Sequence, residues 1–164
     1  MANLKIIKKS KTLVREIQKY KLKKKKIGFV PTLGALHQGH LELIRLAKKK
    51  SDIVVVSIFL NPLQFNSKND FKKYPINLIA DTKKINKEKI NILYIPKINE
   101  VFFNKKIKKI KASKKNNKLC GKFRKGHFDG VVTVLKSLFK TIIFGLKETS
   151  KNTKLLFIAK SRFK

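Results

Sequence analysis

The sequence predicts an α/β fold of the Rossmann-like type, in which helices flank a parallel sheet. Two continuous apolar runs, at residues 27–30 and 52–60, are typical of buried strands. The segment between them carries apolar residues at helical spacing, namely Leu41, Leu43, Ile44, Leu46 and Ala47. Because two parallel strands and their connecting helix form a right-handed βαβ unit, ligands are expected beyond the carboxyl ends of these strands.

Length and composition set the limits of this fold. A chain of 164 residues with 42% hydrophobic residues can bury a core, which excludes disorder throughout. The one cysteine, Cys120, excludes an internal disulfide framework and fits a reducing compartment. The sequence has neither an apolar run long enough to span a membrane nor the apolar region of a signal peptide, so a cytoplasmic protein is expected.

The net charge of +33 would ordinarily suggest a nucleic acid or an anionic membrane as partner. However, only 4 of the 42 basic residues are arginine, whose forked side chain is favoured for recognising phosphates and bases. Lysine, isoleucine, asparagine and phenylalanine are abundant together, as in the product of an A/T-rich coding sequence. We therefore favour a compositional origin of the charge, and a nucleic-acid-binding protein is the less favoured alternative.

The first predicted strand is followed by the sequence P-T-L-G-A-L-H-Q-G-H. Pro31 has no N–H group and is expected to end the strand, while Gly34 and Gly39 permit positive φ or a close approach to a ligand. His37 and His40 come at the start of the predicted helix, where free N–H groups and the helix dipole attract phosphate. Imidazole donates a hydrogen bond when neutral and adds a charge when protonated near pH 7.

Two alternatives remain open for this histidine pair. The histidines could be ordinary surface residues after a βα turn. For a bare H-x-G-H sequence, this interpretation is about as common as phosphate binding. A metal site is less favoured, since no third ligand lies nearby in the sequence.

Two amide side chains follow the second predicted strand. Asn61 and Gln64 lie at a carboxyl end, where their donors and acceptors suit the hydroxyls and carboxylate of a small polar acid. The alternative is that Asn-Pro is simply a turn signal.

The next segments continue the α/β pattern. We predict a helix at residues 76–89 that buries Ile76, Ile79, Ala80 and Ile85, and a third strand at residues 91–96. Lys-rich residues 21–26 are expected to form an exposed basic turn, and residues 104–118 a mobile flap or an edge strand.

A second loop with an imidazole precedes the last strongly periodic segment. Arg124 and His127 lie between glycines, and a helix is predicted to follow, with Val131, Val134, Leu138 and Ile142 among its apolar positions. This arrangement fits a second anion site at a helix start, whereas an R-x-G-H sequence on its own is usually just a loop.

Two motifs closely resemble the signatures of the pantothenate synthetase (pantoate–β-alanine ligase) family, namely V-P-T-L-G-A-L-H-Q-G-H-L and S-I-F-L-N-P-L-Q-F. The family belongs to the adenylyl-transferring enzymes with an H-x-G-H loop, and it usually has methionine at the position of Leu33. The resemblance implies that the following residues bind ATP: Leu33, Gly34, Ala35, Leu36, His37, Gln38, Gly39 and His40. It also implies that His40 is catalytic as the proton donor, and that Gln64 and Asn61 bind the other substrates. The segment R-K-G-H-F-D-G-V resembles the family's R-P-G-H-F-x-G-V, with Lys125 in place of the usual proline, and this resemblance adds Arg124 to the substrate-binding residues.

The resemblance weakens towards the end of the chain. The segment F-G-L-K-E resembles the family's F-G-E-K-D loop, which implies further ATP contacts from Gly145, Leu146, Lys147 and Glu148. We expect an ATP- and pantoate-binding domain at residues 1–148 and a divergent tail, which could be disordered, at residues 149–164. Within this tail, residues 155–158 resemble the start of an apolar helix of the family. The family's second domain is expected to be missing.

The implied reaction joins pantoate to β-alanine through a pantoyl adenylate, with release of AMP and pyrophosphate. Mg²⁺ would accompany ATP, no metal site made of protein ligands is expected, and the family's homodimer is the expected assembly. The main alternative is an inactive, truncated remnant of that enzyme.

Overall fold

The computed structural model describes residues 4–65, 67–102, 110–111, 127–147 and 155–157. Its centre is a five-stranded sheet in which all pairings are parallel, in the order β1-β4-β3-β2-β5. The strands are β1 (Lys5–Ile7), β2 (Ile27–Thr32), β3 (Ile53–Ile58), β4 (Ile92–Tyr94) and β5 (Leu155–Phe157). This arrangement confirms the predicted Rossmann-like α/β class.

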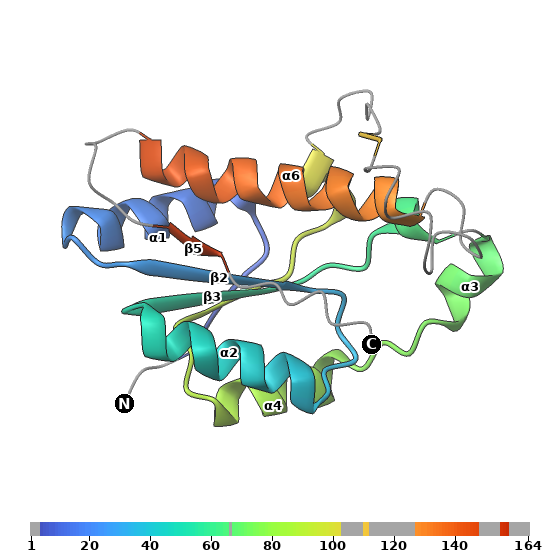
Figure 1. Ribbon diagram of the computed structural model, residues 1–164, viewed down its shortest axis with the longest axis horizontal. Coiled ribbons are helices and arrows are strands. Elements are labelled where there is room, and N and C mark those ends of the chain that lie inside the picture. Colours follow the sequence, from blue (N-terminus) through green and yellow to red (C-terminus); the bar gives the residue numbers. More distant parts are fainter. Residues whose placement is uncertain (1–3, 66, 103–109, 112–126, 148–154, 158–164) are drawn as a thin grey trace.

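Helices cover both faces of the sheet. They are α1 (Ser10–Leu22), α2 (Gln38–Lys50), the 3₁₀ turn η1 (Pro62–Gln64), α3 (Lys68–Lys73), α4 (Leu78–Lys87), α5 (Ile98–Phe102) and α6 (His127–Lys147). Helices α1 and α6 lie together on one face, and α2 and α4 lie on the other (Figure 1). The side of the sheet on which a helix lies follows from right-handed crossovers. The connections through α1 and α6 run along the sheet in one direction, and those through α2 and α4 run in the other, so the two pairs lie on opposite faces.

The core consists of one apolar layer on each side of the sheet. Every residue of β3 is buried, and alternate side chains of β2 and β3 point to opposite faces. Phe29 and Val55 pack towards α1 and α6, where the ring of Phe29 meets that of Phe139 edge to face at 5.7 Å. Val30, on the other face, belongs to the layer that α2 closes with Ile44. The continuous apolar runs therefore reflect burial on both faces.

Strand β2 continues past the proline that was expected to end it. Pro31 lies opposite Ser57 in the pairing with β3, and Thr32 extends the strand further. The carbonyl of Thr32 accepts from the N–H of Phe59 over 3.0 Å, on the β3 side of the strand. Because successive residues of a strand point their backbone groups to opposite sides, the missing N–H group of Pro31 removes no hydrogen bond to β3.

Two surface predictions also need correction. Helix α1 extends into the predicted basic turn, and Lys21 is only 4% exposed rather than solvated. Leu46, expected on the buried side of α2, is 39% exposed. In each case the boundary of the helix and its rotation about its axis decide which side chains face inward. The spacing of apolar residues defines both only coarsely.

Helix α4 is shorter than predicted and is rotated about its axis. Ile76 lies before the helix and Ile79 is 73% exposed, whereas Asp81 and Ile85 face inward. Asp81 and Ile85 are four residues apart and so share one face of the helix. The inward position of Ile85 is thus confirmed, whereas the carboxylate of Asp81 is buried in place of the side chains of Ile76 and Ile79.

The tail contributes a strand instead of an apolar helix. Leu155–Phe157 forms β5 beside β2, so part of the segment assigned to a divergent tail completes the sheet. The flap or edge strand expected at residues 104–118 lies outside the described residues, apart from residues 110 and 111. In the part of the chain that the structure describes, no helix is both long and apolar enough to cross a membrane.

Candidate functional site

The loop after β2 begins with an anchored turn. Gly34 and Ala35 have φ values of 87° and 51°, so two consecutive residues adopt the left-handed conformation. The N–H of Gly34 donates to the hydroxyl oxygen of Thr32 over 3.2 Å, and this hydroxyl donates to the carbonyl of Ser57 over 2.8 Å. The turn is therefore fixed to the carboxyl ends of β2 and β3, the edge where a ligand was expected.

A side chain from α4 completes the turn. The two carboxylate oxygens of Asp81 accept from the N–H groups of Ala35 and Leu36, each over 2.8 Å. Asp81 is 2% exposed, and Lys84, one turn further along α4, donates to the carbonyl of Leu36. Sequence reasoning missed Asp81, although an acidic residue four positions before an inward isoleucine was the available signal.

The two histidines form one unit at the start of α2. His37 is the N-cap residue, and its Nδ1 accepts from the N–H of Gly39 over 3.1 Å. The Nδ1 of His40 accepts from the N–H of His37 over 3.4 Å, and the ring centroids are 4.1 Å apart. Because each Nδ1 is an acceptor, each neutral ring carries its proton on Nε2 and can donate it to an anion.

The small size of Gly39 suits this arrangement. A Cβ atom at Gly39 would lie 3.0 Å from the Cε1 of His37, because the histidine ring folds back over the glycine. Glycine in H-x-G-H therefore makes room for the cap. The sequence predicted positive φ or a close approach to a ligand at Gly34 and Gly39. Positive φ is found at Gly34, and at Gly39 the structure shows the close approach of a neighbouring side chain.

The environment of His40 favours its neutral form. Burial lowers the pKa of His40 below its ordinary value, the neighbouring His37 lowers it further, and the carboxylate of Asp81 opposes both effects. His40 is therefore a neutral hydrogen-bond donor near pH 7. An arriving phosphate group would raise its pKa and favour the charged form.

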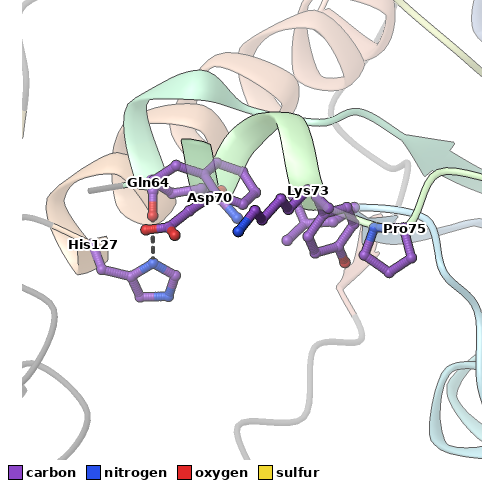
Figure 2. A pocket seen from close by; sticks show the side chains of 8 residues that line it. Gln64, Asp70, Lys73, Pro75 and His127 are labelled. Atoms are coloured by element: carbon purple, nitrogen blue, oxygen red, sulfur yellow. Dashed lines mark hydrogen bonds between the residues drawn. The ribbon is translucent and has the colours of Figure 1, made fainter. Parts of the chain in front are cut away.

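Gln64 lies at the second loop and faces a cavity of about 300 Å³ (Figure 2). It is 5% exposed and belongs to η1, directly after β3. The cavity is lined by Leu33, Gln64, Phe65, Asp70, Lys73, Tyr74, Pro75 and His127. Since Leu33 belongs to the loop after β2, the cavity joins the two predicted motifs.

Asn61 supports this cavity from behind. It is fully buried, and its Nδ2 donates to the Oε1 of Gln64 over 3.2 Å and to the carbonyl of Gly130 over 3.0 Å. Its Oδ1 accepts from the N–H of Leu63 over 3.2 Å. The structure thus places the Asn61 amide against protein groups, in a position to orient the Gln64 side chain.

The start of α6 closes the same side of the cavity. The Nδ1 of His127 donates to the carbonyl of Gln64 over 2.7 Å, as the dashed line in Figure 2 shows. Gly130, one turn later, lies so close to η1 that a Cβ atom would be 2.3 Å from the carbonyl oxygen of Leu63. His127, predicted at a second anion site, therefore lines the same cavity as Gln64 and Leu33. Its predicted companion Arg124 lies outside the described residues.

Helix α3 provides an outer wall that sequence reasoning did not assign. Asp70 and Lys73 line the cavity, and the rings of Phe71 and Tyr74 pack edge to face on Phe65 at 5.4 Å and 5.5 Å. This wall therefore carries a negative charge at Asp70 and a positive charge at Lys73, next to a cluster of aromatic rings. Among the described residues, no group of three or more His, Cys, Asp or Glu side chains could hold a metal ion.

The predicted ATP loop at Gly145 is a helix. Gly145, Leu146 and Lys147 are the last residues of α6, and a Cβ atom at Gly145 would lie 3.0 Å from the side chain of Ile17 on α1. A helix rises about 1.5 Å per residue, which places Gly145 roughly 27 Å from His127 along α6. The glycine thus serves helix packing away from the cavity. Glu148 lies outside the described residues.

Taken together, a parallel sheet with an H-x-G-H turn at its carboxyl edge defines an α/β protein of the H-x-G-H nucleotidyltransferase type. The family model described as Pantoate-beta-alanine ligase matches residues 5–155, and the chain belongs to this family. A pantothenate synthetase of Thermoanaerobacter sp. (strain X514) is 44% identical over 140 residues, covering 82% of this chain and 50% of that protein. One of Pseudothermotoga lettingae is 41% identical over 156 residues, covering 92% and 54%.

Solved structures agree with this assignment. Pantothenate synthetase from Thermus thermophilus superposes with a TM-score of 0.72 at 32% identity, covering 85% of this chain and 49% of that chain. Pantoate-beta-alanine ligase from Francisella tularensis, complexed with beta-gamma ATP and beta-alanine, gives a TM-score of 0.77 at 32% identity, covering 98% and 69%. The chain spans about half the length of the curated relatives that it matches.

Proposed function

We propose that this chain carries the ATP and pantoate sites of an enzyme that condenses pantoate with β-alanine to pantothenate. The observation that supports this proposal most strongly is the cavity in which Leu33, from the H-x-G-H loop, meets Gln64 and His127. A nucleotide on the histidines would thereby lie next to an acid at Gln64. The Francisella relative, complexed with beta-gamma ATP and beta-alanine, supports the choice of substrates.

In the first step, a carboxylate oxygen of pantoate attacks the α-phosphorus of ATP. The bond from this phosphorus to the bridging oxygen breaks, pyrophosphate leaves, and a pantoyl adenylate forms. The Nε2–H groups of His37 and His40 donate to the phosphates, and His40 transfers its proton to the developing negative charge. ATP enters with Mg²⁺ as part of the substrate.

In the second step, the amine of β-alanine attacks the acyl carbon of the adenylate. The bond to the AMP oxygen breaks, an amide forms and a proton is released. Gln64 holds the pantoate group through both steps, and Asn61 keeps the Gln64 amide in place. The protein thus contributes mainly positioning and charge stabilisation. A cytoplasmic location and a homodimer belong to this proposal as well.

The proposal is tested first with His40→Ala. Loss of one positioned proton donor is expected to lower the rate of pyrophosphate release from ATP and pantoate by about a hundredfold or more. Glu42→Ala, an exposed residue on the same helix, is the matched control and should leave the rate unchanged. An unchanged rate in His40→Ala would remove His40 from the catalytic role.

Gln64→Ala separates the two substrates. The side chain follows β3 and not the H-x-G-H loop, so its loss is expected to weaken pantoate binding by about tenfold. Nucleotide affinity, measured by calorimetry with a non-hydrolysable ATP analogue, should change little. Weaker nucleotide binding with unchanged pantoate binding would contradict the assignment of Gln64 to the acid.

A further inference from the structure

The left-handed turn of the H-x-G-H loop needs an external support. Gly34 adopts positive φ freely, but Ala35 at 51° has a Cβ atom that makes this conformation unfavourable. The described chain has two other non-glycine residues with positive φ, Lys24 and Lys89, and both directly follow helix ends, where such a conformation is common. Ala35 instead lies between a strand and a helix, where no helix end explains it.

Asp81 supplies this support through both carboxylate oxygens. Each accepts one backbone N–H, from Ala35 and from Leu36, and the buried carboxylate spans the turn from α4. Successive N–H groups beside left-handed residues form a concave anion site that often holds phosphate. In this protein an internal carboxylate occupies that anion site. The N–H groups of Ala35 and Leu36 are therefore engaged within the protein and are not available to a phosphate.

We propose that Asp81 is a positioning residue that holds the turn in its left-handed form and thereby places His37 and His40 at the start of α2. The expected effect of Asp81 on nucleotide binding rests on the proposed function, whereas its effect on the turn does not. The hydrogen bonds, the distant element that provides the carboxylate and the conformation of Ala35 carry the structural part.

The first test is Asp81→Asn, which keeps the shape of the side chain but removes its charge and one acceptor oxygen. Amide hydrogen exchange at Ala35 and Leu36 should become at least tenfold faster, and affinity for an ATP analogue should fall about tenfold. The matched control is Asp52→Asn, because Asp52 also accepts a backbone N–H, from Lys26, at the opposite edge of the sheet. It should leave both quantities unchanged.

The second test asks whether Asp81 acts on the turn itself. Ala35→Gly removes the unfavourable Cβ, so the double variant Ala35→Gly/Asp81→Asn should recover most of the lost affinity. Lys24→Gly relieves another left-handed residue far from the site and should rescue nothing. Rescue by Ala35→Gly alone identifies the turn as the place where Asp81 acts, which a general packing role would not produce.

Clear outcomes would overturn the proposal. Unchanged exchange at Ala35 and Leu36 in Asp81→Asn would show that the turn keeps its form without the carboxylate. If Asp81→Asn does not fold, the double variant decides, since failure of that protein to fold would assign Asp81 to helix packing. If the unaltered chain binds no ATP analogue, the proposed function fails, while the exchange measurements still decide the role of Asp81.

Discussion

The loop after β2 takes its shape from the carboxylate of Asp81, which reaches it from α4, whereas the segment after β3 is held by the neutral amide of Asn61 and by α6. Both segments line the cavity, through Leu33 and Gln64. A charged group tolerates small changes of distance, because its attraction falls off gradually. A buried amide network in contact with a glycine has no such tolerance. The first loop should therefore respond to the loss of a charge at Asp81 and to the protonation of His40, and the second loop should respond to the addition or removal of single atoms.

The largest expected effect comes from Gly130→Ala. In an open helix this change would stabilise by about 1 kcal/mol, but here the new Cβ would lie 2.3 Å from the backbone oxygen of Leu63. Displacing η1 should cost about 3 kcal/mol, so the free energy of unfolding should fall by roughly 2 kcal/mol in a denaturant titration. The affinity for pantoate should fall with it, since Gln64 belongs to η1.

Gly145→Ala is the comparison within the same helix. Its Cβ would meet side-chain atoms of Ile17 at 3.0 Å, and a side chain can move more easily than a backbone carbonyl. A smaller loss of stability and unchanged substrate affinity are expected. If Gly130→Ala proved to be the milder of the two, the second loop would not depend on this contact.

A smaller effect is expected from Asn61→Ala. The change leaves the buried carbonyl of Gly130 without its Asn61 donor and frees Gln64, at a cost of about 1 kcal/mol in unfolding free energy. Asn69→Ala, at an exposed position, should stay within about 0.5 kcal/mol. Chemical denaturation of both variants measures this difference. Equal effects would mean that water replaces the amide and that the network adds no stability.

The smallest expected effect concerns pH and sharpens the contrast at the first loop. Burial holds the pKa of His40 in the folded protein below its ordinary value of 6.5. As the pH falls, His40 is therefore protonated in the unfolded chain at a higher pH than in the folded protein. The contribution of neutral His40 is complete above pH 6.5, and the free energy of unfolding should decrease below that pH. His40→Gln should reduce the slope of stability against pH between pH 5 and 6.5. Identical slopes in the two proteins would contradict a lowered pKa.

The prediction of the central βαβ unit succeeded because burial determines most of its sequence. Strand β3 is apolar apart from Ser57 and α2 carries its apolar stripe at helical spacing, so periodicity distinguishes the two elements. The third strand was predicted for the same reason. The loops that follow these strands could be located from topology, because ligands collect at the carboxyl edge of a parallel sheet.

The rest depended on contacts between distant segments. Leu155–Phe157 is too short for its period to show, and only its place beside β2 makes it a strand. Gly145 resembled a loop glycine until its contact with Ile17 revealed a helix packed on α1. Asp81 was overlooked because an acidic residue on a helix is normally exposed, and its two N–H partners lie 45 and 46 residues away in the sequence.

The hydrogen bond from His127 to the carbonyl of Gln64 has a consequence for tautomers. A carbonyl can only accept, so Nδ1 of a neutral His127 carries the proton and Nε2 carries a lone pair. His40 has the opposite tautomer, with its lone pair on Nδ1 and its proton on Nε2. The same residue type thus offers a proton to an anion from the loop after β2 and a proton acceptor from the start of α6. In each histidine a backbone group selects the tautomer, the N–H of His37 for His40 and the carbonyl of Gln64 for His127.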